Sequence, residues 1–245
     1  MKRWAWLMVG LVLGAIAFWP AAFLEGIVQR ALPAGASVAL SGSIWNGQGQ
    51  VQLAGTVWPF AWRFAPARLL AAQLTWQLYA KPAGALASTQ ISVGFSGLTM
   101  RAPQFDGEIR ALHGLLPALK LAGVQGRAQL SAANLELTPA TAWQVGGDGR
   151  LMLSELSVAA IGGSTLGTHE FSVRGGGESI AIEVIRSDGT LKLEGRGSVN
   201  NKGEYTVQGS ALPLTSFDAD ARARLSRFAT LQSDGRFRFD ARGKW

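Results

Sequence analysis

Hydrophobic residues follow this chain in two different patterns, one continuous and one alternating. The continuous pattern covers residues 4–24, which carry no charge and lie between Lys2 and Arg3 on one side and Glu25 on the other. At about 1.5 Å per residue, a helix of this length spans roughly 30 Å, the thickness of the hydrocarbon core of a bilayer. We therefore expect a transmembrane anchor over residues 4–24, preceded by a short stub of residues 1–3.

The charges that flank this apolar run predict its orientation. Lys2 and Arg3 favour a cytoplasmic N-terminus, which sends the remainder of the chain to the far side of the membrane. The alternative is a cleavable signal peptide, whose apolar stretch is shorter and is followed closely by a small-x-small cleavage site. The segment Ala34-Gly35-Ala36 has that form, but it lies after Arg30 and far beyond the apolar run. The spacing thus favours an uncleaved anchor.

The residues after the anchor change to a helical period. Over residues 25–32, Ile27, Val28, Ala31 and Leu32 are apolar, and Pro33 follows. This spacing predicts a short helix that a proline ends. We assign residues 25–36 to a stem between the anchor and a folded domain.

From Ser37 onward the apolar residues alternate with polar ones, which is typical of half-buried β-strands. The alternating positions are Val38 and Leu40; Val51, Leu53 and Val57; Ile91, Val93 and Phe95; Leu135 and Leu137; Leu151 and Leu153; Ile180, Ile182 and Val184; Leu191 and Leu193; Tyr205 and Val207; and Phe237 and Phe239. We expect residues 37–245 to form a mainly β domain. Its fold class is a curled antiparallel sheet, as an open trough, a sandwich or a jelly-roll-like form.

Turn signals separate the expected strands. They are Asn46-Gly47, Gly146 to Gly149, Ser187 to Gly189, Asn201 to Gly203 and Ser233 to Gly235. Such residues accept the backbone conformations of tight hairpins. Two leucine-rich stretches, 66–74 and 112–121, depart from the alternation and predict a turn or two of helix, which would cap an open end of the sheet.

The composition excludes several functional classes. Cysteine is absent, so the chain has no disulfide, thiolate metal site or cysteine nucleophile. The formal charge of +7 is spread singly along the sequence. A nucleic-acid surface concentrates its positive charge, so we expect no nucleic-acid partner.

Candidate chemistry is equally sparse. His113 and His169 are far apart and belong to no metal-ligand motif, and we expect both in turns or facing solvent. No nucleophile elbow is present, and Gly175 to Gly177 is typical of a hairpin loop rather than a phosphate loop. We expect no catalytic, cofactor-binding or metal site, and therefore no enzyme.

Aromatic residues form the most conspicuous group, and we take them as the candidate site. They are Trp45, Trp58, Phe60, Trp62, Phe64 and Trp76. The four from Trp58 to Phe64 alternate and therefore share one face of a strand. That face is either core or, in part, an exposed apolar patch for a partner or a lipid.

Two motifs carry a family resemblance. Residues 42–47 read Gly-Ser-Ile-Trp-Asn-Gly, and residues 62–70 read Trp-Arg-Phe-Ala-Pro-Ala-Arg-Leu-Leu. In these motifs the chain resembles type II secretion system protein N, with Ile44 in place of the usual leucine. The resemblance implies an accessory inner-membrane subunit of the machine that exports folded proteins from the periplasm of Gram-negative bacteria. It implies the assembly platform and the outer-membrane channel as partners, and it brings no catalytic residue.

A second hypothesis comes from the expected shape. An anchored, curled sheet with an apolar concave face resembles in outline the bridge-like lipid carriers of the bacterial envelope. This alternative function is the binding or transfer of lipid.

Overall fold

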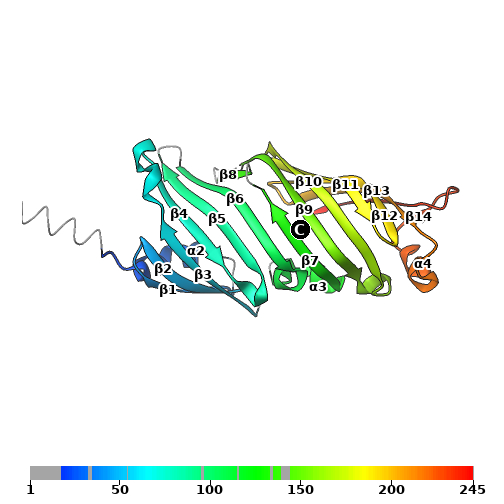
Figure 1. The fold of residues 1–245 in the computed structure, drawn as a ribbon, viewed down its shortest axis with the longest axis horizontal. Coiled ribbons are helices and arrows are strands. Elements are labelled where there is room, and N and C mark those ends of the chain that lie inside the picture. The colour runs from blue at the N-terminus through cyan, green and yellow to red at the C-terminus, as the bar shows by residue number, and fades with distance from the viewer. Residues whose placement is uncertain are drawn as a thin grey trace, which may run out of the picture.

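The chain folds into one curled antiparallel sheet (Figure 1). The structure is a computed structural model, which describes residues 18–32, 35–53, 55–94, 97–114, 116–132, 135–138 and 144–244. The sheet has 15 strands, and its order follows the chain from β1 to β13, then β15 and β14, with β8 pairing β6 and β9 off the main path. This meander confirms the mainly β prediction.

The strands have the following bounds. They are β1 Ser37–Gly42, β2 Asn46–Leu53, β3 Thr56–Phe64, β4 Leu74–Ala80, β5 Leu86–Gly94, β6 Gly97–Glu108, β7 Val124–Ser131, β8 Glu136–Thr138, β9 Gln144–Val158, β10 Thr165–Gly177, β11 Ser179–Asp188, β12 Leu191–Asn200, β13 Glu204–Pro213, β14 Thr230–Leu231 and β15 Phe237–Lys244. Within the described ranges β1 and β14 end the order without pairing each other, so the sheet is open. Of the three expected forms, the open trough agrees with this topology.

Short helices lie before the sheet and between its strands. They are η1 Ala21–Leu24, α2 Glu25–Ala31, η2 Pro66–Ala71, η3 Pro82–Gly84, η4 Ile109–Leu112, α3 Pro117–Leu121, η5 Ala159–Ile161 and α4 Ala219–Leu225. Helix α2 confirms the helix expected over residues 25–32. Helices η2, η4 and α3 confirm that the two leucine-rich stretches leave the strand pattern.

The expected anchor lies mostly outside the described residues, which begin at Phe18. Pro20 is extended, with φ −67° and ψ 137°, and forms an antiparallel bridge with Ser43. One continuous helix to Leu24 is therefore wrong for the last residues of the predicted span. In the part of the chain that the structure describes, no helix combines the length and the apolar character needed to cross a bilayer.

Two of the predicted turns are strand residues instead. Asn46-Gly47 begins β2, and Gly146 to Gly149 lie inside β9. A Cβ atom on Gly47 would lie 2.3 Å from a ring carbon of Trp62, so this glycine makes room for an indole rather than a turn. The turns predicted around Gly189, Gly203 and Gly235 are confirmed, since each lies between two paired strands.

Candidate functional site

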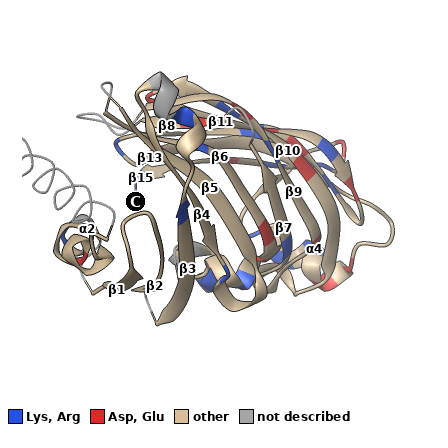
Figure 2. Cartoon of the chain, turned by 60° about the vertical axis from the view of Figure 1, so that its left-hand side comes forward, with Lys and Arg blue, Asp and Glu red and all other residues tan. Residues whose placement is uncertain are grey.

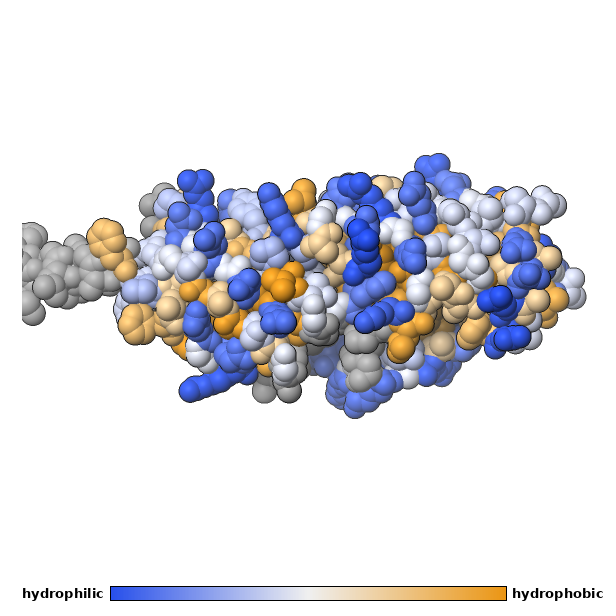
Figure 3. Space-filling model, turned by 90° about the horizontal axis from the view of Figure 1, so that it is seen from below, coloured by the Kyte–Doolittle hydropathy of each residue, from blue (hydrophilic) through white to orange (hydrophobic). Residues whose placement is uncertain are grey.

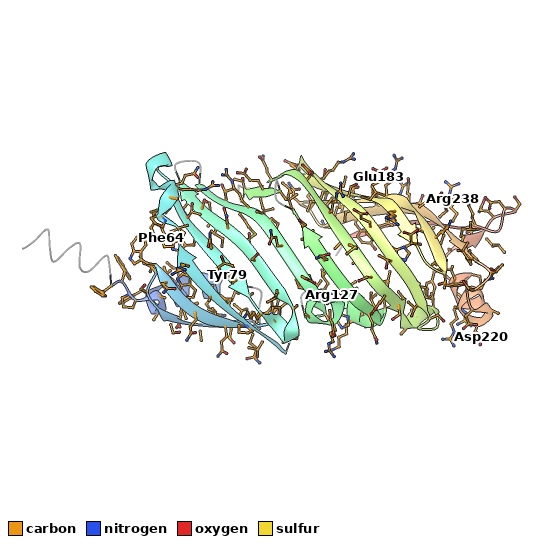
Figure 4. The ribbon with its side chains drawn as sticks, viewed as in Figure 1. Phe64, Tyr79, Arg127, Glu183, Asp220 and Arg238 are labelled. Carbon is orange, nitrogen blue, oxygen red and sulfur yellow. The ribbon has the colours of Figure 1, made fainter. Side chains whose placement is uncertain are left out.

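One side of the sheet is apolar along its whole path, and we call it the inner face. Cross-strand pairs carry it from strand to strand, because residues that pair directly lie on the same side of a sheet. The pairs include Val38 with Val51, Trp62 with Leu78, Ile91 with Met100, Leu130 with Leu151, Phe171 with Val184, and Ala211 with Phe237. Polar and charged residues alternate with these positions and form the outer face. Tyr79, Arg127, Glu183 and Arg238 mark that face in Figure 4.

The inner face is closed by other elements only in part. A buried cluster runs from β6 to β15, where Phe105, Leu166 and Phe237 pack with Ile161 of η5 and Ala221 of α4. In the N-terminal strands β1 to β5, the main contacts of each strand are with its neighbours and with short helical segments. Apart from the buried Trp62, the large apolar residues of these strands are half-buried or exposed, as expected for one layer without a facing layer.

A space-filling view and a cartoon coloured by charge agree with this arrangement. From below, apolar side chains lie between hydrophilic ones along the length of the molecule (Figure 3). Basic and acidic residues are interspersed along the strands rather than gathered by sign (Figure 2). The expected dispersed charge is therefore confirmed for the described residues.

The candidate aromatic residues gather at the N-terminal end of the inner face. The ring centroids of Trp45 and Phe64 are 4.8 Å apart in an edge-to-face arrangement. Phe64 and Trp76 are 5.7 Å apart, and Phe60 and Trp62 are 5.8 Å apart. These separations fall within the range in which aromatic pairs attract each other.

Two indole groups attach this cluster to the loop between β1 and β2. The Trp62 Nε1–H donates to the carbonyl oxygen of Ser43 at 3.1 Å, and the Trp76 Nε1–H donates to that of Ile44 at 2.8 Å. The backbone N–H of Phe64 donates to the carbonyl oxygen of Trp45 at 2.6 Å. The first family motif is thus a loop that the tryptophans of β3 and β4 hold in place.

Burial separates the six candidates. Trp62 is 7% exposed and belongs to the core, whereas the other five are half-buried. The indole nitrogen of Trp58 is buried without a hydrogen-bond partner among the described residues. Trp62 is therefore core, and its neighbours leave part of their apolar surface accessible, so that a role of this surface toward a partner or a lipid stays a prediction.

A second apolar group lies just before the sheet. Phe18, Phe23 and Ile27 are 82%, 71% and 65% exposed. Trp19 packs edge-to-face on Phe23, and its carbonyl oxygen accepts the backbone N–H of Ile44 at 3.0 Å. The exposed residues are therefore joined to the loop that the aromatic cluster holds.

The outer edge of β1 is capped by side chains of α2. Glu25 Oε1 accepts the backbone N–H of Leu40 at 2.6 Å, and Gln29 Oε1 accepts that of Val38 at 3.2 Å. Gln29 Nε2 also donates to the carbonyl oxygen of Ala36 at 2.6 Å. The sequence analysis missed this role, because Glu25 was interpreted only as the end of an apolar run.

The two histidines differ from each other. His113 lies in the turn after η4, as expected, with Nε2 2.9 Å from the carbonyl oxygen of Val124. The expectation for His169 is wrong: it is fully buried in β10, with Nδ1 2.8 Å from Ser187 Oγ and Nε2 without a partner in the described part of the chain. Burial lowers the pKa of His169, and the charge of Asp188 opposes this shift in part. The alternation of apolar and polar residues does not predict that a histidine will be buried.

The described residues contain no cluster of three or more potential metal ligands. Gly175 to Gly177 are the last residues of β10 and pair with β9, so they are strand residues next to a hairpin and not the predicted loop. What the geometry offers is therefore binding surface: a half-covered apolar face, an aromatic cluster and two sheet edges of different character.

By its fold the chain is a mainly antiparallel β protein built on one curled sheet. The family described as type II secretion system (T2SS), protein N, matches residues 36–240, and the chain belongs to this family. It is an accessory family of the secretion apparatus and not a known family of enzymes. The comparisons with curated proteins and with solved structures gave no match.

Proposed function

We propose that this protein is an accessory subunit that assembles or stabilises the type II secretion machine, without enzymatic activity of its own. The part of the apolar run that precedes Pro20 anchors it in the inner membrane of a Gram-negative cell, residues 1–3 stay in the cytoplasm, and the sheet lies in the periplasm. The family assignment carries this proposal. The exposed apolar residues Phe18, Phe23 and Ile27 support it, since such residues before a folded domain suit a membrane surface.

The proposed partners are the assembly platform and the outer-membrane channel. A photo-reactive amino acid replaces either Trp58 or Phe60 on the inner face, or Tyr79 on the outer face as the matched control. If the inner face docks a secretion component, the first two positions cross-link to it in cells and Tyr79 does not. Normal secretion in a deletion strain, together with no cross-link at any position, would contradict the proposal.

A reporter fusion tests the topology separately. Alkaline phosphatase joined after Trp245 is expected to be active, because it folds in the periplasm. If alkaline phosphatase is inactive in this fusion, and a reporter that works only in the cytosol is active when joined at the same place, both the anchor and the envelope location are ruled out.

A second candidate function is the binding or transfer of lipid, and the half-covered inner face favours it. At about 4.8 Å between neighbouring strands, the 15-stranded sheet offers an apolar path on the order of 60 Å. One leaflet of a bilayer has a hydrocarbon depth of about 15 Å, so the path exceeds the length of an acyl chain.

The two isoleucines of β11 allow a matched test of this function. Ile182 lies on the inner face and is half-buried, whereas Ile185 is exposed on the same strand. If lipid occupies the inner face, mass spectrometry of the purified full chain detects bound lipid that Ile182→Gln reduces and Ile185→Gln leaves unchanged. A delipidated chain that takes up no acyl chains would exclude this function.

A further inference from the structure

Most of strand β15 forms an open edge of the sheet in the part of the chain that the structure describes. Strand β14 pairs only with Phe237 and Arg238 of β15. From Phe239 to Lys244, β15 pairs with β13 alone among the described residues. An edge of this kind presents a row of backbone donors and acceptors to any extended chain beside it.

The hydrogen-bond pattern shows which backbone groups of β15 face outward. The backbone N–H of Gln232 donates to the carbonyl oxygen of Arg236 at 2.8 Å, so Arg236 faces the β14 side. In an antiparallel ladder, alternate residues direct their N–H and C=O groups to the same side. Asp240 and Arg242 therefore direct their backbone groups away from β13.

The charged side chains along this edge carry a net positive charge. Within β15, Arg238, Arg242 and Lys244 stand against one acidic residue, Asp240, while Arg236 just before the strand is ion-paired with Glu194 and Asp234. Arg242 and Asp240 approach to 3.5 Å as an exposed ion pair, and Arg238 and Lys244 form no ion pair among the described residues. An acidic segment complements this edge.

The side chains of β15 that point to the inner face are apolar. Phe237 is 1% exposed in the buried cluster, and Phe239 packs against the same cluster. A strand added beside β15 continues this alternation, because neighbouring strands share faces. Its residues beside Phe239 and Ala241 extend the inner face and are apolar, and the residues between them face the basic side chains.

We propose that β15 docks an extended segment of a partner protein in which acidic residues alternate with apolar ones. The segment adds a strand beside Phe239–Lys244, so that backbone hydrogen bonds supply affinity and the alternating side chains supply specificity. A second copy of this chain fits less well, because pairing two β15 edges brings basic rows together. The proposal goes beyond the proposed function and does not depend on the partner being a secretion component.

The test uses the full chain in detergent and a blocked, fluorescent peptide of alternating valine and glutamate. Fluorescence anisotropy is expected to show saturable binding that weakens as salt rises. A lysine-for-glutamate peptide, and a glutamate peptide N-methylated on alternate residues, are each expected to bind at least about tenfold more weakly.

Two substitutions at one position separate the backbone from the charge. Arg242→Pro removes an outward N–H without touching the ladder to β13, whereas Arg242→Gln removes the same charge and keeps the N–H. The proline variant is expected to bind the glutamate peptide at least about tenfold more weakly than the glutamine variant, with the same circular dichroism spectrum.

Three outcomes would overturn the proposal. The first is equal binding of the glutamate and lysine peptides, and the second is equal affinity of the two Arg242 variants for the glutamate peptide. The third is a dimer of the unmodified chain that Arg242→Pro abolishes, because this would assign the edge to a second copy. None of these readouts involves secretion, so a failure here leaves the proposed function to its own tests.

Discussion

At the β1 edge, side chains of α2 bind the outward backbone groups, whereas at the β15 edge six residues have no neighbour on one side among the described residues. Glu25 and Gln29 of α2 accept the outward N–H groups of Leu40 and Val38. Only the two-residue β14 lies against the start of β15. Natural sheets protect their edges against uncontrolled pairing, so an edge covered by a preceding helix and an edge left open serve different purposes.

The interior differs between the same two ends. Near β1 the apolar face consists of tryptophan and phenylalanine rings that hold a loop through indole hydrogen bonds. Near β15 it consists of a buried cluster that η5 and α4 close. The N-terminal end of the sheet is therefore stabilised by local contacts around one loop, and the C-terminal end by tertiary packing.

Phe237→Ala is expected to have the largest effect on this comparison. Phe237 is 1% exposed, so its loss leaves a cavity under β15 and lowers the free energy of unfolding by about 4 kcal/mol. Urea denaturation measures the change. The control is Phe239→Ala, a half-buried neighbour on the same face, which should cost clearly less. Equal losses for the two variants would mean that the cluster does not hold this edge.

Gly47→Ala is expected to disturb the opposite end by about 3 kcal/mol. The new Cβ would lie 2.3 Å from the Trp62 ring and 2.5 Å from the carbonyl oxygen of Ser41, so the indole that holds the β1–β2 loop must move. Tryptophan fluorescence during unfolding reports both stability and ring environment. Gly146→Ala is the control, because a Cβ there meets nothing within 4 Å. An unchanged midpoint for Gly47→Ala would contradict the account of the loop.

Glu25→Ala opens the capped edge and is expected to cost about 2 kcal/mol, the range for a hydrogen bond to a charged group. The backbone N–H of Leu40 then lacks the acceptor that it has at 2.6 Å. Thermal unfolding measures the loss, with Arg30→Ala on the same helix as the control. Comparable stability of the two variants would show that the cap is incidental.

The smallest expected effect is a change of stability with pH, and it comes from His169 of β10, a strand between the two edges. Burial holds the pKa of His169 below its model-compound value of 6.5. Stability is then complete above pH 6.5, and it falls as the pH drops from 6.5 through the folded pKa, because the unfolded chain binds the proton more readily. Unfolding of the wild-type chain and of His169→Leu across this range tests the sign. A wild-type chain that gained stability on acidification relative to His169→Leu would contradict it.

Much of the fold follows from the alternation of apolar residues. Trp58, Phe60, Trp62 and Phe64 share the inner face as their spacing predicts. Asn46-Gly47 misled because the same dipeptide that favours a tight turn also gives an indole room to pack, and only the partner strand decides between these roles. The capping role of Glu25 could not be predicted for a similar reason, because it depends on β1 being the edge strand of the sheet.

The grouping of the candidate aromatic residues was predictable in part. Six aromatic residues were identified by density and period, and the structure brings Trp45, Phe64 and Trp76 together through a loop contact. The open β15 edge was not predictable, because alternation defines a strand but not which strand has no neighbour. Edges depend on the pairing of the whole chain.

Amide hydrogen exchange on the full chain tests the difference between the edges most directly. The amides of Val38 and Leu40 are expected to exchange at least about a hundredfold more slowly than those of Asp240 and Arg242, because among the described residues only the first pair donates to fixed acceptors. Equal protection of the two pairs, or faster exchange at Leu40 than at Arg242, would contradict a sheet that is capped at β1 and open at β15.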